Sequence, residues 1–271
     1  MLNIIRQSHE VWGECPTGFE DNLRLIEKAG RLCYKSEEKI TDDSYIEFDN
    51  KLVTREHFAM IEHSWLVIAV RARQAALDDS KFIYRKANGA GFIYAGNYRA
   101  YMEAMGMTRL EQIKTFFPAQ VVSNIPLWAK AVSVKFITNR AMSHELVRHR
   151  PSSYAQLSQR YVDHAKGIDF ILPIRFYDKD QMNPKYDVWH TACEIAAESY
   201  KRLREYKESP QEARDVLPNS TATEILITSS LPEWWHIFKL RCSAGADPTM
   251  RALMGPVRDD FEKAGWLPQP E

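Results

Sequence analysis

The sequence predicts an α/β (α+β) fold, a single domain with a central mixed sheet flanked by helices. Segments rich in β-branched residues alternate with segments whose apolar residues recur every three or four positions. The chain has 271 residues, of which 45% are hydrophobic, so it can bury a sizeable core. No glycine-serine linker, internal repeat or low-complexity tract divides it. We therefore expect one domain over residues 1–271, with an insertion at about 75–130.

The first half of the chain predicts two helices and a strand. Apolar residues share one helical face over 19–35 and again over 51–61. Residues 64–72 have the length and the β-branched composition of a strand. The stretch 75–130 carries four glycines and one short helix candidate at 97–105, and elaborate insertions of this kind often carry function.

The second half predicts a strand at 131–138 and a helix at 139–150, which Pro151 would end because proline disfavours helical geometry in the residue before it. A long helix is expected over 187–207. Its predicted apolar stripe consists of Val188, Ala192, Ile195, Ala196, Leu203 and Tyr206.

A further strand and two further helices follow. Residues 223–228 have strand composition. Ser230 stands three residues before Glu233 with a proline between them, which is the spacing of a helix capping box. Asp247 precedes Pro248 and is expected to open the last helix in the same way.

Charge and cysteine content restrict the function. Basic and acidic residues number 36 each, whereas a binder of nucleic acid polymers or anionic membranes needs a basic surplus. The four cysteines form no metal or disulfide pattern, and the N-terminal residues lack the pattern of a signal peptide. The longest apolar run is too short to cross a bilayer. We expect a soluble, cytoplasmic protein without a nucleic acid or membrane partner.

Polar chemistry is concentrated in one segment, residues 139–161. It holds six arginines and histidines close together and only one acid, Glu145. If Pro151 ends the helix, the serines and the tyrosine at 152–154 lie beside the guanidinium groups and can bind one anion with them. Two other interpretations are a solvated helix end and a nucleic acid stripe. The order of the residues favours a ligand site.

This segment resembles the flavin-dependent thymidylate synthases, the ThyX family, whose signature is R-H-R-x-x-S-x(4)-S-x-R. The pattern is filled without a gap by Arg148, His149, Arg150, Ser153, Ser158 and Arg160. Residues 57–63 resemble the family's H-x-x-x-x-E-H element, and residues 213–218 its A-R-x-x-L-P element. The later W-x-H and L-R elements are matched by Trp234, His236, Leu240 and Arg241. The resemblance covers roughly residues 20–74 and 131–265.

The resemblance implies an FAD-dependent methyltransferase. Such enzymes make dTMP from dUMP with methylenetetrahydrofolate as carbon donor, FAD as hydride carrier and NADPH as reductant, and without a covalent protein nucleophile. It also implies a homotetramer with shared active sites. Cys242, beside Arg241, is the one cysteine with basic surroundings, and we do not expect it to act as a nucleophile.

The same resemblance assigns the site residues. Arg241 would be catalytic, because it would favour the N3-ionised uracil and so make C5 a better nucleophile. The residues expected at the flavin are His57, Arg148, His149, Arg150, Gln156, Ser230 and His236. Those expected at dUMP are Glu145, Arg148, Gln156, Leu157, Ser158, Gln159, Arg160, Arg214 and Arg241. No metal ligand is expected, since His144 and His149 miss the H-E-x-x-H spacing by one residue.

Several positions depart from the family pattern. Ser230 and Pro232 stand where many members have an Asn and an Arg that hold FAD, and Ala59 replaces a small hydroxyl residue. Residues 96–101 of the insertion, Gly-Asn-Tyr-Arg-Ala-Tyr, resemble the Gly-Asn-x-Arg-Ala-Trp string that is missing near residue 230. Our hypothesis is that Asn97 and Arg99 restore the cofactor contacts.

Two other functions stay open. One is a related flavoenzyme that modifies C5 of a pyrimidine nucleotide in another way, because a fold does not fix a function. The other is a non-enzymatic nucleic-acid-binding module, against which the neutral composition speaks. No G-x-G-x-x-G string occurs, so FAD would not be bound in a Rossmann manner.

Overall fold

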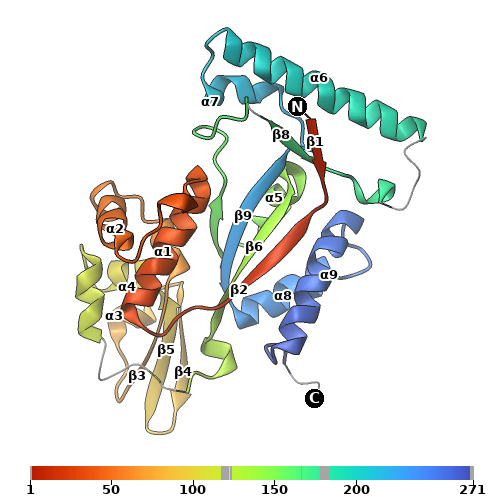
Figure 1. Cartoon of the computed structure of the whole chain (residues 1–271). Helices are drawn as coiled ribbons and strands as arrows, with labels where there is room; N and C mark the ends of the chain where they lie inside the picture. Colours follow the sequence, from red (N-terminus) through yellow and green to blue (C-terminus); the bar gives the residue numbers. More distant parts are fainter. Residues whose placement is uncertain (1, 117–121, 123, 166, 178–182, 269–271) are drawn as a thin grey trace.

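The computed structural model describes residues 2–116, 122, 124–165, 167–177 and 183–268. Its central sheet has four antiparallel strands in the order β2-β6-β9-β7 (Figure 1). These strands are β2 (Ser8–Glu14), β6 (Ala131–Asn139), β9 (Ala222–Ser230) and β7 (Ser153–Gln156). The α/β fold class is confirmed, but the central sheet is antiparallel and not mixed as expected, because within the described residues parallel pairing is confined to a separate, smaller sheet.

Two smaller sheets flank the central one. The first contains β3 (Trp65–Val70), β5 (Gly91–Asn97) and β4 (Ile83–Asn88), all antiparallel. The second is the parallel pair of β1 (Leu2–Ile5) and β8 (Ile168–Ile171). The β4–β5 hairpin lies inside the predicted insertion, where the sequence indicated only a short helix.

The helices cover the sheets on both sides (Figure 1). They are α1 (Phe19–Tyr34), α2 (Ser44–Thr54), α3 (Ala75–Asp78), α4 (Tyr98–Ala104), α5 (Arg140–Leu146), α6 (Pro184–Glu205), α7 (Pro210–Ala213), α8 (Leu231–Arg241) and α9 (Pro248–Lys263). No described helix is long and apolar enough to cross a membrane.

Strand β9 shows how the core is divided. Successive side chains of a strand point to opposite faces. Leu226 packs against Ala29 and Leu32 of α1, whereas Ile225 and Ile227 join the cluster formed with α5, α8 and α9. The central sheet is therefore covered on both faces, and β9 is buried along most of its length.

Two predicted helices end earlier than expected. The helix predicted over 51–61 stops at Thr54, because Glu56 has a left-handed φ of 56°, and a 3-10 helix, η2 (Met60–His63), follows. The helix predicted over 139–150 stops at Leu146. There the Tyr154 hydroxyl lies 2.8 Å from the Leu146 carbonyl oxygen and satisfies an acceptor that the helix leaves open.

The apolar stripe predicted for the long helix is confirmed only at Ala196, which is buried, and Leu203, which packs against the core, whereas the other four residues are exposed. In α6, Val188, Ile195 and Tyr206 are 74%, 63% and 71% exposed. The buried face instead contains Cys193 and Tyr200, which pack against β8. Both faces of α6 carry apolar residues, so the periodicity alone did not distinguish them.

Asp49 of α2 provides a test of the packing beneath α1. Its side chain is 3% exposed, and neither carboxylate oxygen has a hydrogen-bond partner among the described residues. Burial, with Glu27 and Glu111 nearby, raises the pKa of Asp49 to about 9. The folded carboxyl is therefore protonated at neutral pH, whereas the unfolded one is ionised above about pH 4.

We predict that Asp49→Asn removes a pH dependence of stability. The contribution of the native carboxyl to the free energy of unfolding is complete below about pH 4. It is lost as the pH rises to about 9, and the free energy of unfolding falls by about 1.4 kcal/mol per pH unit at most. Urea unfolding at pH 5.5 and pH 8 should show a smaller difference for the variant than for the native protein. The control is Asp79→Asn, at an exposed position. Equal pH dependence in Asp49→Asn and native protein would contradict the prediction.

Candidate active site

The signature turn, residues 147–152, connects α5 to β7 at the end of β9. Asn139 caps α5 by accepting a hydrogen bond from the Met142 amide at 2.9 Å. The Tyr154 hydroxyl lies 2.7 Å from the His149 carbonyl oxygen, and the Ser152 hydroxyl donates to Ser229 at 3.0 Å. The backbone of the turn is thus fixed to the central sheet, while Arg148 and Arg150 are exposed.

Arg241, at the last position of α8, reaches the signature turn. Its Nε donates to His149 Nε2 at 2.9 Å, its Nη1 to the Glu145 carboxylate at 2.6 Å, and its Nη2 to the Glu145 carbonyl oxygen at 2.9 Å. The arginine side chain is 19% exposed. Three groups from α5 and the turn therefore fix the plane of the guanidinium, and part of its outer edge is left for a ligand.

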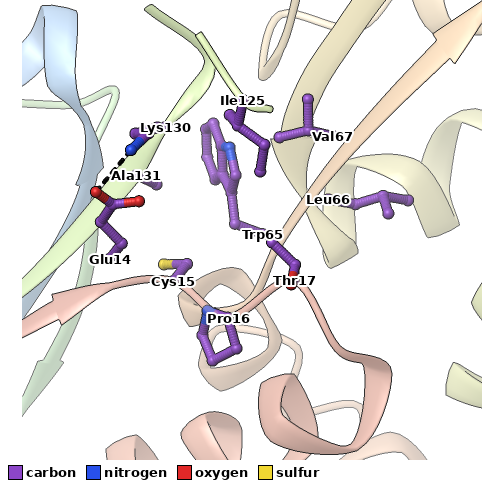
Figure 2. A pocket seen from close by; sticks show the side chains of 10 residues that line it. All are labelled: Glu14, Cys15, Pro16, Thr17, Trp65, Leu66, Val67, Ile125, Lys130 and Ala131. Atoms are coloured by element: carbon purple, nitrogen blue, oxygen red, sulfur yellow. Dashed lines mark hydrogen bonds and ion pairs between the residues drawn. The ribbon is translucent and has the colours of Figure 1, made fainter. Parts of the chain in front are cut away.

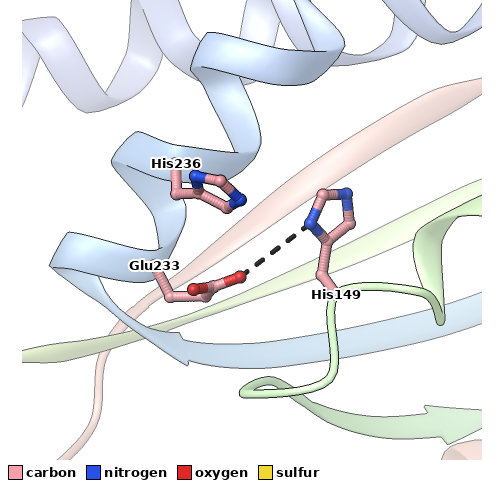
Figure 3. A group of neighbouring side chains, drawn as sticks. All are labelled: His149, Glu233 and His236. Carbon is pink, nitrogen blue, oxygen red and sulfur yellow. Dashed lines mark ion pairs between the residues drawn. The ribbon is translucent and has the colours of Figure 1, made fainter.

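His149 also faces two residues of α8, as Figure 3 shows. Its Nδ1 lies 3.9 Å from a Glu233 carboxylate oxygen, and the His236 ring is 6.3 Å away, edge to face. Burial, followed by the positive charge of Arg241 and by His236, lowers the pKa of His149 to about 4. His149 is therefore neutral at physiological pH.

The group of His149, Glu233 and His236 has the composition of a metal site, since its ligand atoms lie within 4.8 Å of one another. However, Arg241 donates to His149 Nε2, so the ring proton is on Nδ1. Nδ1 is the nitrogen that faces Glu233, and a metal bound between the two residues would need it unprotonated. Metal binding would require this hydrogen bond to break. The absence of a resident metal stays a prediction.

A second set of cations lies at the start of α5. Burial, together with the like charge of Arg214, lowers the pKa of Arg140. Neither arginine forms an ion pair with any residue in the described ranges. Arg160 donates from Nε to Gln211 of α7, close to Arg214 in the chain. Two neighbouring cations without a counter-charge are suited to an anion.

Gln156 connects this region to the sheet. Its Nε2 donates to Ser143 at 2.9 Å and to Thr223 at 3.2 Å. Ser158 lies beyond it, and its amide donates to the Cys33 carbonyl oxygen. Leu157 is buried, and the Gln159 Nε2 is buried without a partner among the described residues. Five of the predicted dUMP residues, 156–160, therefore lie at the end of β7 and just beyond it, whereas Glu145, Arg148, Arg214 and Arg241 lie on other segments.

A third feature is a cavity of about 230 Å³ between the insertion and the signature turn. It is lined on one side by Asn97, Arg99 and Glu103 of the insertion, and on the other by Glu62 and by residues 150–153. Arg99 pairs with Glu62 and with Glu103, both at 2.7 Å. The structure thus places Asn97 and Arg99 beside the arginine-rich turn.

Other predicted residues lie apart or have a structural role. The His57 side chain is exposed, and among the described residues no hydrogen bond to it is present, whereas His63 of the same element is buried and bonded to Thr228 at 2.7 Å. Ser230 is 4% exposed and caps α8 by accepting from the Glu233 amide at 3.4 Å. The predicted helix cap is confirmed, and the Ser230 hydroxyl oxygen is engaged in it as an acceptor.

The thiols are not activated. Burial raises the pKa of Cys15 to about 12, that of Cys33 and Cys193 to about 11, and that of Cys242 above its usual value. Cys15 lies beside a cavity of about 10 Å³, with room for about one water molecule (Figure 2). The Glu14–Lys130 ion pair and Trp65 line this cavity. None of the four thiols has the lowered pKa of a nucleophile.

Sequence reasoning missed three residues of the candidate site. The sequence marks Glu233 only as part of a helix cap, Arg140 only as part of a basic segment, and Glu62 only as part of a motif. Each of these residues is separated in the sequence by three or more helices or strands from a residue that it faces in the fold. The unusual density of charge in these motifs was the only signal available.

We predict that inorganic phosphate binds between Arg140 and Arg214. At constant ionic strength, phosphate should raise the melting temperature of the native protein, because the anion relieves the repulsion of the two guanidinium groups. Arg214→Met should abolish most of this increase and should raise the melting temperature without phosphate. Arg258→Met, at an exposed position of α9, is the control. An equal phosphate effect in Arg214→Met would exclude this site.

Comparison with known proteins identifies the family. The model of the Thy1 family, described as thymidylate synthase complementing protein, matches residues 129–268. Flavin-dependent thymidylate synthases are similar over part of the chain. That of Geobacter sulfurreducens is 37% identical over 116 residues, which cover 42% of this chain and 49% of the relative. That of Mycobacteroides abscessus is 32% identical over 149 residues, which cover 49% and 58%.

The chain spans about half the length of the curated relatives it matches. Among solved structures, a UMP/dUMP methylase PolB from Streptomyces cacaoi bound with 5-Br dUMP aligns over 97% of this chain and 93% of that one. Its TM-score is 0.46 and its sequence identity is 16%. That similarity is too low to support an argument.

The family match starts just before β6 and ends after α9, so it leaves out the β4–β5 hairpin and α4. It includes the signature turn, Arg140, Arg214 and Arg241. Because the matched residues make up just over half of the 271 in the sequence, the chain belongs to the thymidylate synthase complementing proteins, the Thy1 or ThyX family.

Proposed function

We propose that this protein is a flavin-dependent thymidylate synthase, which converts dUMP to dTMP. The observation that carries the proposal is the arrangement of cations along α5. Arg140 is the first residue of α5, and Arg214 lies close enough to lower its pKa. Arg241 is bound to Glu145, which is next to the last residue of the helix. A seven-residue helix spans roughly 10 Å, a length comparable to the separation of phosphate and base in a nucleoside monophosphate.

In this proposal the chain binds dUMP along α5. Arg140, Arg160 and Arg214 hold the phosphate, for which guanidinium groups are well suited. The outer edge of Arg241 faces the uracil ring and stabilises negative charge at N3, so that C5 becomes more nucleophilic. Gln156, Leu157, Ser158 and Gln159 supply further contacts to the nucleotide. The chain provides position and electrostatics, and its thiols take no part.

The cofactors are FAD, NADPH and methylenetetrahydrofolate. FAD supplies hydride transfer when it is bound. The described residues offer an anionic dinucleotide the guanidinium groups of Arg99 and Arg150, which line one cavity, and the two carboxylates of the same lining, Glu62 and Glu103, are both paired with Arg99. The cavity and the group of His149 and His236 lie on opposite sides of the signature turn. We propose that the flavin binds at the turn, between them.

A similarity between two strand ends supports the proposed role of Asn97 and Arg99 in holding the cofactor. In the central sheet, Ala131 pairs with Ser230, the cap of α8. In the small sheet, Trp65 pairs with Asn97, which caps α4 by accepting from the Ala100 amide at 2.8 Å. The insertion therefore repeats the strand-to-helix geometry of residue 230, and we propose that it provides the Asn and Arg that residues 230 and 232 lack.

Two broader proposals accompany this one. The four cysteines are free, which supports a reducing, cytoplasmic compartment. We also propose a homotetramer with shared active sites, in which the outward apolar residues of α6 would be covered in part. Light scattering of the purified protein measures the assembly directly.

We predict that Arg99→Ala weakens FAD binding at least tenfold, because the variant loses a guanidinium from the cavity wall. The measurement is a titration of the apoprotein with FAD, followed by flavin fluorescence. The matched control is Arg109→Ala, an exposed arginine of the same insertion. If FAD affinity and turnover are both unchanged in Arg99→Ala, the insertion does not hold the cofactor.

The main test is product formation. The purified protein should show flavin absorption, oxidise NADPH only when dUMP is present, and form dTMP with methylenetetrahydrofolate. Arg241→Lys should lower kcat by about 10²- to 10³-fold, as loss of a charge-stabilising donor does elsewhere. Arg258→Lys, on the exposed face of α9, is the control.

Two outcomes would contradict the proposal. A protein that takes up no flavin is not an enzyme of this class. A hydroxymethylated nucleotide in place of dTMP would identify the alternative function, a related flavoenzyme that modifies C5 of a pyrimidine nucleotide.

A further inference from the structure

His149 offers Arg241 an acceptor that only one form of the imidazole has. The Arg241 Nε–H group points at His149 Nε2 across 2.9 Å, and an arginine has no acceptor to offer in return. His149 Nε2 must therefore be unprotonated, and in a neutral ring the proton is then on Nδ1. The imidazole is fixed in one tautomer by its partner.

Glu233 lies on the other side of the same ring. Its carboxylate oxygen is 3.9 Å from Nδ1, longer than a direct hydrogen bond but close enough for its charge to favour a proton there. Glu233 is in the first turn of α8 and Arg241 is its last residue. His149 thus connects the two ends of one helix through opposite ring nitrogens.

The charged and polar groups around His149 come from three elements. From α8 they are Arg241, Glu233 and His236, and from α5 there is Glu145, which is bound to Arg241. From β7 the Tyr154 hydroxyl contacts the His149 carbonyl oxygen. Only Glu233 and Glu145 carry negative charge, and of these Glu233 is the one that faces the ring directly.

We propose that Glu233 and His149 form a positioning pair for Arg241, in which Glu233 holds the proton of the ring on Nδ1 and Nε2 anchors the arginine. This inference rests on the proposed function for the role of Arg241 in catalysis. If His149 took up a second proton, two donors would face each other and the guanidinium would be released from the turn. The pair gives Glu233 a role beyond the helix-capping spacing in which the sequence places it.

The first test is the tautomer, measured by NMR on full-length protein with ¹⁵N-labelled histidine. The signal of His149 is assigned by its absence from His149→Gln. At pH 7 we expect Nδ1 protonated and Nε2 unprotonated. In Arg241→Met we expect a mixture of tautomers and a higher pKa for His149, because the neighbouring positive charge is gone. Glu233→Gln should reduce the Nδ1 preference, whereas Glu262→Gln, an exposed glutamate of α9, should not.

The second test is kinetic, at saturating FAD and dUMP. His149→Ala should lower kcat about tenfold or more, as expected for loss of a hydrogen bond to a charged group, with a smaller change in KM. His149→Gln should restore part of this loss, since its carbonyl oxygen can accept from Arg241 but cannot titrate. A merely structural role would not distinguish the two variants in this way.

Three results would overturn the proposal. One is a native His149 with its proton on Nε2, and another is a tautomer and pKa that do not change in Arg241→Met. The third is a kcat for His149→Ala equal to that of the native protein, or no better retained in His149→Gln. A native protein without dUMP-dependent turnover would instead contradict the proposed function, and the NMR result would still decide how the ring holds Arg241.

Discussion

The position of the whole site depends on the antiparallel pairing of β7 with β9. Ser153 lies opposite Thr228 and Gln156 opposite Ile225. Because β9 continues directly into α8, this pairing brings the signature turn to the start of that helix, where Glu233 and His236 lie. It also directs β7 back toward the start of α5, where Gln156 meets Ser143. A one-residue slip would turn these side chains to the opposite face of the sheet.

The insertion applies the same arrangement a second time. Strands β3 and β5 pair so that Trp65 lies opposite Asn97, and the helix cap stands at the strand end as it does at Ser230. The Trp65 indole donates to the Ala129 carbonyl oxygen at 2.8 Å and joins the small sheet to the entrance of β6. The signature turn is therefore approached by two helix starts, from α8 on one side and from α4 on the other.

The sequence could predict features that depend on local chemistry. The caps at Ser230 and Asp247 and the strands at 64–72, 131–138 and 223–228 are all confirmed, because each depends on a few neighbouring residues. The buried face of α6 could not be predicted, since apolar residues occur around most of that helix and the contacts with β8 decide between them. The hairpin β4–β5 was missed because its first strand, with Arg85 and Lys86, is mostly exposed and polar.

The same division applies to the site. The arginines were found as a motif, but their partners were not, because Glu233 and Glu145 are separated from each other by the whole of β7 to β9 in the chain. Which cation has a counter-charge is a property of the fold. Arg241 has Glu145, and Arg99 has Glu62 and Glu103.

This distribution of counter-charges separates two kinds of cation in a chain whose formal net charge is zero. A guanidinium that is paired with a carboxylate is held in a defined orientation and attracts a further anion weakly. Such a pairing suits an arginine that must contact one part of a ligand in a fixed geometry. Arg140 and Arg214, which have no such pairing within the described ranges, repel each other, and an anion that entered between them would relieve this repulsion. In the proposed function, attraction of the phosphate and orientation of the base would therefore fall to different arginines at the two ends of α5.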